Sequence, residues 1–238
     1  MIFITGDIHG NLTRVKHFVD SYNTTTNDIL IILGDVGFNY WLDGRDTTLK
    51  EMAKELPITF FCIRGNHEER PETAITDTYA LHTQEFCGDS VLVENNFPNI
   101  KYAMDGHIYN FNGAKCLVMG GAYSVDKDYR IMRNWKWFED EQLSENELRN
   151  IYNNIKGQSF DYVLTHTCPF NTQPTHLFLD SIDQDSVDKT MEHWFQDIAD
   201  SINFKYWYFG HYHGNWQNDR YIMLYTDFLQ LGDVLDED

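Results

Sequence analysis

The chain has 238 residues, of which 42% are hydrophobic, and a formal net charge of −19. This length and apolar share suffice for a folded domain with a substantial core. The negative charge argues against non-specific binding to DNA, RNA or anionic membranes, all of which favour a basic surface. No linker, repeat or stretch of 18 apolar residues divides the sequence. We therefore expect one domain over residues 1–238, located in the cytoplasm.

The N-terminal third alternates between short apolar runs and helical patterns. The runs Ile2–Ile4, Ile29–Leu33 and Ile58–Ile63 have little polar alternation, as in strands that are buried on both faces. Between them, apolar residues recur at helical spacing from Leu12 to Val19 and from Leu49 to Leu56. This βαβαβ order predicts an α/β fold with right-handed parallel connections.

The middle of the chain changes to short strands and tight turns. Four segments there have the composition of strands: Ser90–Glu94, Ile100–Ala103, His107–Phe111 and Lys115–Met119. Asn112 and Gly113 indicate a tight hairpin turn between the last two. We therefore expect a mixed sheet or a second sheet in this region.

The C-terminal part again combines helices and strands. Ser144 and Glu147 form a capping box, and Leu143 and Leu148 fit a hydrophobic staple, so a helix is expected there. Another helical pattern runs from Val187 to Ile198. Strands are expected at residues 162–164, 206–209 and 221–225, and the last of these is expected to close the sheet. The acidic tail, residues 233–238, is expected to be a solvated end.

Side chains that can bind metal ions directly follow five of the predicted strands. They are Asp7, His9, Asp35, Asn66, His166, His211 and His213. Because ligands collect outside the carboxyl ends of parallel strands, segments that are distant in sequence can converge at one edge of a sheet. This mixture of nitrogen and oxygen donors, without cysteine, suits Mn, Fe, Zn, Co or Ni better than Ca.

Each segment alone has a simpler explanation. An isolated Asp-x-His or His-x-His is weak support for a metal site, and Gly65–Glu68 could form an ordinary turn. Five such segments, each after a predicted buried strand, make a chance occurrence improbable. The two oxygens of Asp35 are suited to bridge a pair of cations. The sequence therefore predicts a site for two divalent transition metal ions, with Mn favoured.

The order of these segments resembles the motif series of the calcineurin-like metallophosphoesterases, which is Asp-x-His, Gly-Asp, Gly-Asn-His-(Asp/Glu), His and Gly-His-x-His. In this chain the motifs stand at Asp7–His9, Gly34–Asp35, Gly65–Glu68, His166 and Gly210–His213. The resemblance implies a four-layer αββα sandwich, in which two mixed β-sheets are flanked by helices. It also implies that one ion is held by Asp7, His9 and His213, that the other is held by Asn66, His166 and His211, and that Asp35 bridges them.

The same constellation suggests how a phosphate ester would be hydrolysed. Two cations would lower the pKa of a bridging water and hold the phosphoryl oxygens, so that hydroxide attacks in line. His67 has no assigned coordination role and is the candidate general acid that protonates the leaving oxygen. Glu68 or Asp7 could orient His67 and stabilise its charged form. The alternative is that His67 is a turn residue without a catalytic role.

The chain departs at one motif from the protein-phosphatase and dinucleoside-tetraphosphatase branch that it otherwise resembles. That branch follows Gly-Asp with an Asp-Arg-Gly element, which supplies a phosphate-binding arginine. Here Gly34 and Asp35 are followed by Val36–Asn39, so protein phosphatase activity is in doubt. Arg64, next to the third motif, could take over the phosphate contact or could face away into the sheet.

Two further segments offer possible substrate contacts. Lys127 and Arg130 lie in a loop that resembles a loop of small bacterial members of the family, and both are candidate phosphate contacts. The alternative is a surface ion pair between Asp126 and Arg130. The aromatic pairs Tyr40–Trp41 and Trp135–Trp137 could stack on a nucleobase or could pack around the edge of the site.

The sequence therefore predicts a metal-dependent phosphoesterase that hydrolyses a phosphomonoester, a phosphodiester or a nucleotide. The expected partner is a small phosphorylated molecule or nucleotide, with no strong nucleic-acid binding and no membrane binding. The alternatives are a non-catalytic metal-binding interaction module on the same fold and a partner-dependent nuclease. The lack of a basic stripe argues against a nuclease that acts alone.

Overall fold

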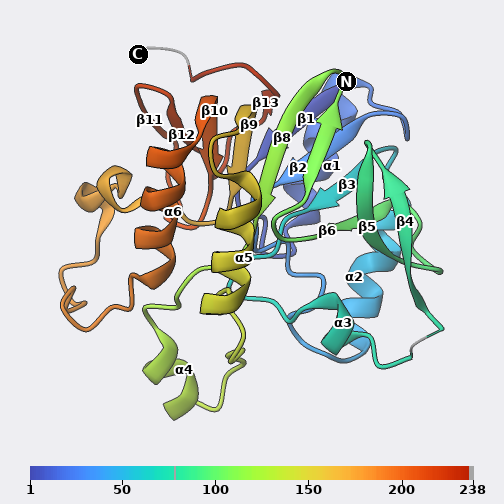
Figure 1. Ribbon diagram of the computed structural model, residues 1–238. Coiled ribbons are helices and arrows are strands. Elements are labelled where there is room, and N and C mark those ends of the chain that lie inside the picture. Colours follow the sequence, from blue (N-terminus) through green and yellow to red (C-terminus); the bar gives the residue numbers. More distant parts are fainter. Residues whose placement is uncertain (78, 236–238) are drawn as a thin grey trace.

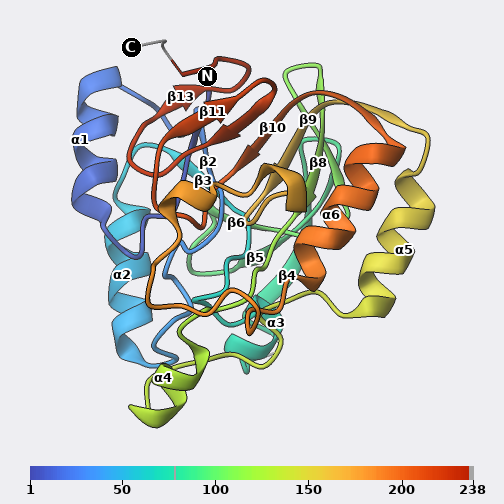
Figure 2. The same cartoon turned by 90° about the vertical axis from the view of Figure 1, so that its left-hand side faces the viewer.

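Two β-sheets lie face to face in the computed structural model, and helices cover the outer face of each sheet (Figure 1). Figure 2 shows α1 (Leu12–Tyr22) and α2 (Gly44–Lys54) on one outer side, and α5 (Glu145–Ile155) and α6 (Thr190–Ser201) on the other. The expected four-layer αββα sandwich is confirmed.

The structure describes residues 1–77 and 79–235. Its first sheet has the strand order β13-β1-β2-β3-β6-β5-β4. These strands are β1 (Ile2–Thr5), β2 (Ile29–Ile32), β3 (Thr59–Cys62), β4 (Leu81–Phe86), β5 (Asp89–Glu94), β6 (Ile100–Ala103) and β13 (Leu229–Gln230). β1, β2, β3 and β6 pair in parallel, and α1 and α2 connect the first three, as the βαβαβ pattern predicted. The pairs β13–β1, β6–β5 and β5–β4 are antiparallel, so the sheet is mixed.

The second sheet has the strand order β11-β12-β10-β9-β8-β7. Its strands are β7 (Ile108–Phe111), β8 (Ala114–Met119), β9 (Ser159–Thr165), β10 (Asn203–Phe209), β11 (Trp216–Asn218) and β12 (Tyr221–Met223). The hairpin between β7 and β8 turns at Asn112 and Gly113, whose φ angles are 54° and 96°. The predicted tight turn is therefore confirmed, because positive φ at both positions is what a two-residue hairpin requires.

The apolar side chains divide into three clusters, one between each pair of neighbouring layers. Phe3 and Leu30 point from the first sheet towards α1 and α2. Ile4 and Ile31, which follow them directly, point towards the second sheet and share a cluster with Leu164. A third cluster lies between the second sheet and the helices α5 and α6. Both faces of the central strands are thus buried, which explains why their sequences lack polar alternation.

Two local expectations were wrong, and one strand was missed. The strand predicted at 221–225 does not close its sheet, because the chain reverses near Asp219 and β11 pairs with the outer edge of β12. β4 was not predicted, because most of its side chains are polar and exposed. The helix expected from Val187 begins instead at Thr190, whose N–H donates to the Asp188 side chain.

The acidic tail is only partly a solvated end. Residues 236–238 lie outside the described residues. Leu235 packs against the cluster between the two sheets, and its N–H donates to Gln217 Oε1 at 3.0 Å.

The remaining helices are short. They are α3 (Pro71–Ala74), α4 (Lys127–Met132), η1 (Phe170–Thr172) and η2 (Thr175–Leu177). Among the residues that the structure describes, no helix has the length and apolar character needed to span a bilayer.

The capping box of α5 gives a prediction about stability. Ser144 Oγ accepts the N–H of Glu147, and Glu147 Oε2 accepts the N–H of Ser144 at 2.7 Å. The substitution Ser144→Ala removes one of these acceptors, so we expect the free energy of unfolding to fall by about 1 kcal/mol in urea denaturation. Asn153→Ala, at an exposed position of the same helix, is the control and should change it by less than about 0.5 kcal/mol. Equal stability of the two variants would show that the box contributes nothing measurable.

Candidate metal centre

The carboxyl ends of β1, β2, β3, β9 and β10 meet at one edge of the sandwich. We call this edge the rim, and its loops carry Asp7, His9, Asp35, Asn66, His166, His211 and His213. Two contacts join loops of different sheets there. His166 Nδ1 lies 2.7 Å from the carbonyl oxygen of Leu33, and the N–H of His211 donates to Asp7 Oδ1 at 2.9 Å. The structure therefore brings all seven predicted side chains together.

Asp7, His9 and His213 form the first group of potential metal donors. His213 Nε2 lies 3.3 Å from Asp7 Oδ2 and 2.9 Å from His9 Nε2. Asp7 is 1% exposed, and among the described residues its Oδ2 accepts no hydrogen bond of regular geometry, with the His213 imidazole at 3.3 Å beside it. A buried carboxylate oxygen with so weak a partner is costly, and a cation held jointly by these three side chains would compensate it. The residues present thus fit a divalent metal ion.

Asn66, His166 and His211 form the second group. Asn66 Oδ1 lies 2.8 Å from His166 Nε2 and 3.2 Å from His211 Nδ1. His166 Nδ1 faces the carbonyl oxygen of Leu33, which can only accept, so Nδ1 carries a proton. When the ring is neutral, Nε2 and Asn66 Oδ1 are two acceptors that face each other, an arrangement that a nearby cation would stabilise.

The protonation state of His211 also fits a metal ligand. Burial lowers the pKa of His211 to about 3, and the neighbouring His166 acts in the same direction. His211 is therefore neutral at physiological pH, which is the form of imidazole that binds metal ions.

Two residues that the sequence did not single out orient the amide of Asn66. Asn66 Nδ2 donates to Ser124 Oγ at 2.7 Å, and Ser124 Oγ donates to Glu141 Oε2 at 2.6 Å. Since the amide nitrogen is engaged, the amide oxygen points towards the two imidazoles. The position of Ser124 in the loop after a parallel strand, β8, is the sequence signal that could have identified it.

Asp35 lies between the two groups. Its Oδ2 is 3.9 Å from His9 Nε2 and 3.7 Å from His166 Nε2, and its Oδ1 accepts the N–H of His67 at 2.8 Å. Burial opposes ionisation of Asp35, but the imidazoles of His166, His67 and His9 lower its pKa overall. The carboxylate is therefore ionised and lies where a bridging ligand would be needed.

Four of the seven residues have an unusual backbone conformation. His9, Asp35, His211 and His213 have φ angles of 44°, 49°, 69° and 53°. The left-handed region costs an L residue roughly 1–2 kcal/mol, and such strain is typical of functional sites. Close packing adds a second constraint, because a Cβ atom at Gly34 would overlap the ring of His166.

Glu68 lies behind the rim and stabilises two of its loops. Its carboxylate accepts the N–H of Gly65 at 2.9 Å and the N–H of Gly37 at 3.3 Å. Burial, with a contribution from the charge of Asp35, raises the pKa of Glu68 to about 7. The carboxylates within 4 Å of the His67 ring, within the described part of the chain, are instead Asp35 and Asp126, at 3.7 and 3.9 Å.

His67 faces the open side of the rim, and its side chain is 22% exposed. Arg130 Nη2 lies 3.2 Å from His67 Nδ1, and Arg130 Nη1 donates to the hydroxyl of Tyr40 at 3.2 Å. Arg130 Nε also pairs with Asp126 at 2.8 Å. The ion pair between Asp126 and Arg130 is therefore present, and Arg130 nevertheless lies beside the site.

The other two candidate phosphate contacts point elsewhere. Arg64 donates to the carbonyl oxygen of Glu141 at 2.8 Å and lies 3.3 Å from Asp105 Oδ2, so it faces away from the rim. Lys127 Nζ lies 4.2 Å from the centre of the Trp137 ring. Of the three cationic residues considered from the sequence, Arg130 is the one that contacts His67.

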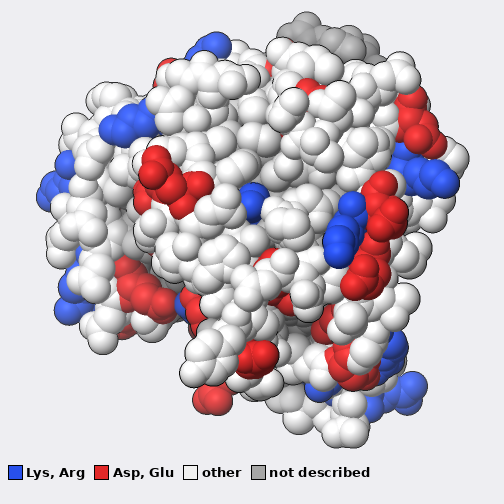
Figure 3. Space-filling view, turned by 90° about the vertical axis from the view of Figure 1, so that its right-hand side faces the viewer, with Lys and Arg blue, Asp and Glu red and all other residues white. Residues whose placement is uncertain are grey.

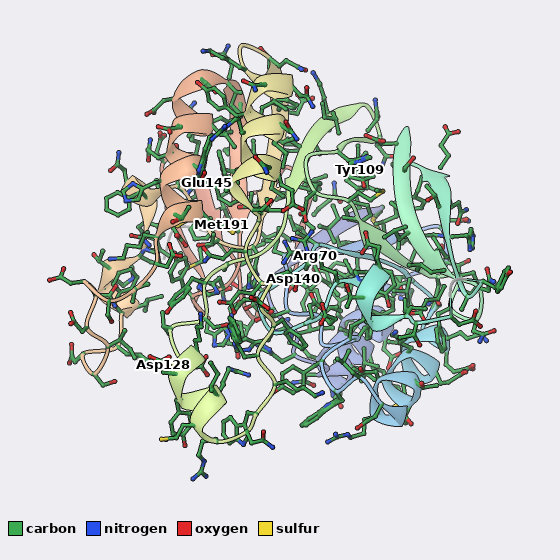
Figure 4. All side chains as sticks on the ribbon, turned by 60° about the horizontal axis from the view of Figure 1, so that its bottom comes forward. Arg70, Tyr109, Asp128, Asp140, Glu145 and Met191 are labelled. Carbon is green, nitrogen blue, oxygen red and sulfur yellow. The ribbon has the colours of Figure 1, made fainter. Side chains whose placement is uncertain are left out.

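An ion pair fixes the segment that carries Glu141. Arg70 Nε lies 2.9 Å from Asp140 Oδ2, and the two side chains lie side by side in Figure 4. The loop after β3 is thereby joined to the segment that orients Ser124 and Asn66.

Comparison with known proteins gives the family. The model of the family described as calcineurin-like phosphoesterase matches residues 1–215. A search of curated proteins finds no match. One similar solved structure has a TM-score of 0.53 at 14% identity, and the match covers 94% of this chain and 88% of that chain, so it shows the fold alone. Another, phosphopantetheinyl hydrolase from Mycobacterium tuberculosis, has a TM-score of 0.44 at 10% identity, with 94% and 87% covered.

The match spans the motifs from Asp7 to His213, whose side chains converge at the rim, and the sandwich is the architecture that the motifs implied. The chain belongs to the calcineurin-like phosphoesterase family, and this membership supports the hydrolysis of phosphoester bonds as its activity.

Proposed function

We propose that the protein hydrolyses a phosphate ester or anhydride with two divalent transition metal ions, Mn²⁺ being the first candidate. The observation that carries the proposal is the convergence of metal-binding atoms from distant segments at the rim: Asp7 Oδ2 lies 3.3 Å from His213 Nε2, and Asn66 Oδ1 lies 2.8 Å from His166 Nε2. Asp7, His9 and His213 would hold one ion, Asn66, His166 and His211 the other, and Asp35 would contact both. Bound there, the ions would supply the Lewis acidity that activates water and attracts phosphoryl oxygens.

His67 is the candidate proton donor in this proposal. His67 also lies with His9 and Asp35 in a further group of potential metal donors, but the two groups named above each have three donors without it. It is also partly exposed on the side from which a substrate would approach. A proton from His67 would neutralise the leaving oxygen, and Arg130 beside it is a donor that can bind phosphoryl oxygens.

The alternative functions have less support. A non-catalytic interaction module has no evident need for an imidazole and a guanidinium beside the two groups. A nuclease would need a continuous basic surface. On the face shown in Figure 3, acidic and basic side chains are intermixed. We propose a small phosphorylated molecule as the partner and the cytoplasm as the location.

The direct test is hydrolysis by protein that has been stripped of metal. We expect an aryl phosphate monoester or the matching diester to be hydrolysed only after Mn²⁺ is restored, because the protein groups alone supply no strong nucleophile. The preferred ester will distinguish a phosphatase from a phosphodiesterase. Absence of turnover for both esters, with two ions shown to be bound by elemental analysis, would favour the interaction module.

Asp35→Asn tests the bridging position. We expect bound Mn²⁺ to fall below two ions per chain and kcat/KM to fall by about 1,000-fold or more, because one anionic donor common to both groups is lost. Metal analysis and steady-state kinetics measure the two effects. Asp20→Asn, at an exposed position of α1, is the matched control and should keep both metal and activity. Normal metal content in Asp35→Asn would contradict the bridging assignment.

His67→Ala tests the proton donor. We expect kcat for phenyl phosphate to fall by about 100- to 10,000-fold while the metal content stays unchanged. The loss should be much smaller for 4-nitrophenyl phosphate, whose leaving oxygen needs little protonation. His82→Ala, an exposed histidine on β4, is the control. The assignment fails if both esters are affected equally.

A further inference from the structure

A pocket of about 390 Å³ opens beside the rim and has not been given a role so far. His9 and His67 of the rim line it together with the aromatic and apolar side chains of Tyr40, Trp41 and Leu49. Arg45 and Arg130 also line it. This volume is at the lower end of the range of small-molecule sites.

The position of His67 indicates which part of a substrate would occupy the pocket. A general acid must lie within hydrogen-bond reach of the atom that it protonates, which here is the leaving oxygen. Because His67 lines the pocket, the group attached to that oxygen would extend into it if His67 is the general acid. The other lining residues would then select the leaving group.

A hydrogen-bonded turn carries Trp41, which lines this pocket. It is 41% exposed, which is a large exposure for an indole. The backbone N–H of Trp41 donates to Asp46 Oδ1 at 3.0 Å, and the backbone N–H of Leu42 donates to Asp46 Oδ2 at 2.7 Å. Asp46 is itself 5% exposed, so a buried carboxylate holds the turn that carries the indole.

Arg45 and Tyr40 lie beside the indole of Trp41 and carry hydrogen-bond donors. The guanidinium carbon of Arg45 lies 3.7 Å from the centre of the Trp41 ring. Arg45 donates to Asp43 from Nε and Nη2, which leaves Nη1 without a side-chain partner in the described part of the chain. The ring of Tyr40 meets Trp41 edge-on, with centroids 4.7 Å apart. A flat ring that enters the pocket would thus find an aromatic neighbour and hydrogen-bond donors.

We propose that the substrate is a nucleotide, that its nucleoside is the leaving group, and that Trp41 determines this specificity by stacking on the base. The inference rests on the proposed function, since it uses His67 to locate the leaving group. Indole and guanidinium groups stack on bases. Bases carry ring acceptors such as N7 that guanidinium groups recognise, whereas the ring of a tyrosine phosphate carries none.

The test compares two monoesters that differ only in the base, adenosine 5′-monophosphate and ribose 5-phosphate, with Mn²⁺-loaded protein. If the first assay shows that diesters are preferred, the methyl esters of both replace them. We expect kcat/KM of the wild-type protein to be about tenfold or more higher for the adenosine compound. In Trp41→Ala this ratio should approach one, mainly through a higher KM for the adenosine compound, and Trp41→Phe should restore most of it.

The control and the contrary outcomes separate this inference from the proposed function. Trp135→Ala removes another exposed tryptophan, 51% against 41% for Trp41, that does not line the pocket, and should keep the wild-type ratio. A wild-type ratio near one, an equal effect of Trp41→Ala on both esters, or a preference for O-phosphotyrosine over the nucleotide would overturn the inference while the phosphoesterase stands. Absence of hydrolysis of every ester by metal-loaded protein would overturn the proposed function. In that case calorimetric binding of adenosine 5′-monophosphate that is unchanged in Trp41→Ala would overturn the inference as well.

Discussion

The structure depends on a concentration of electron-pair donors at one edge of two sheets. Asp7 and Asp35 are both buried carboxylates, and Asn66 Oδ1 faces an imidazole nitrogen that is an acceptor when the ring is neutral. Such groups oppose one another unless positive charge lies among them. Imidazolium rings can provide part of this charge, and lowered pKa values of both carboxyls reflect it. Divalent cations would provide more positive charge than the imidazolium rings. They would also leave His211 neutral, as its pKa of about 3 requires.

The sandwich keeps these donors in place against their repulsion. Parallel strands of the two sheets end at the same edge, the apolar cluster between the sheets holds them together, and the contact of His166 with the Leu33 carbonyl joins them at the rim. The strained backbone of His9 and His213 persists because each loop directly follows a buried strand end, that of β1 or β10. Glu68 stabilises two loops of the rim, because its carboxylate accepts the N–H groups of Gly37 and Gly65. The strain and the repulsion are therefore balanced by the packing of the core, since no single contact at the rim is strong enough to balance them.

The sequence was sufficient for features that depend on strand ends and turns, and insufficient for features that depend on long side chains. Asp35 and His166 could be identified because a polar residue directly after a buried parallel strand can lie only at one edge. Arg64 and Arg130 could not be distinguished, since the direction of an arginine depends on distant carbonyl and carboxylate partners. Ser124 was missed because its role arises from a hydrogen bond to Asn66, which is 58 residues away.

The charges around the aromatic pocket suggest that one part of the site attracts the phosphate and another part selects the leaving group. Arg45 is paired with Asp43 and Arg130 with Asp126, so neither guanidinium adds much net charge. With a chain charge of −19, long-range attraction of a phosphate would then have to come from the cations proposed at the rim. The paired guanidinium groups retain their planar shape and their remaining donors, which act only over short distances. Under this division the metal centre would bind the phosphoryl group of any ester, and Trp41 with its neighbours would decide which leaving group fits beside His67.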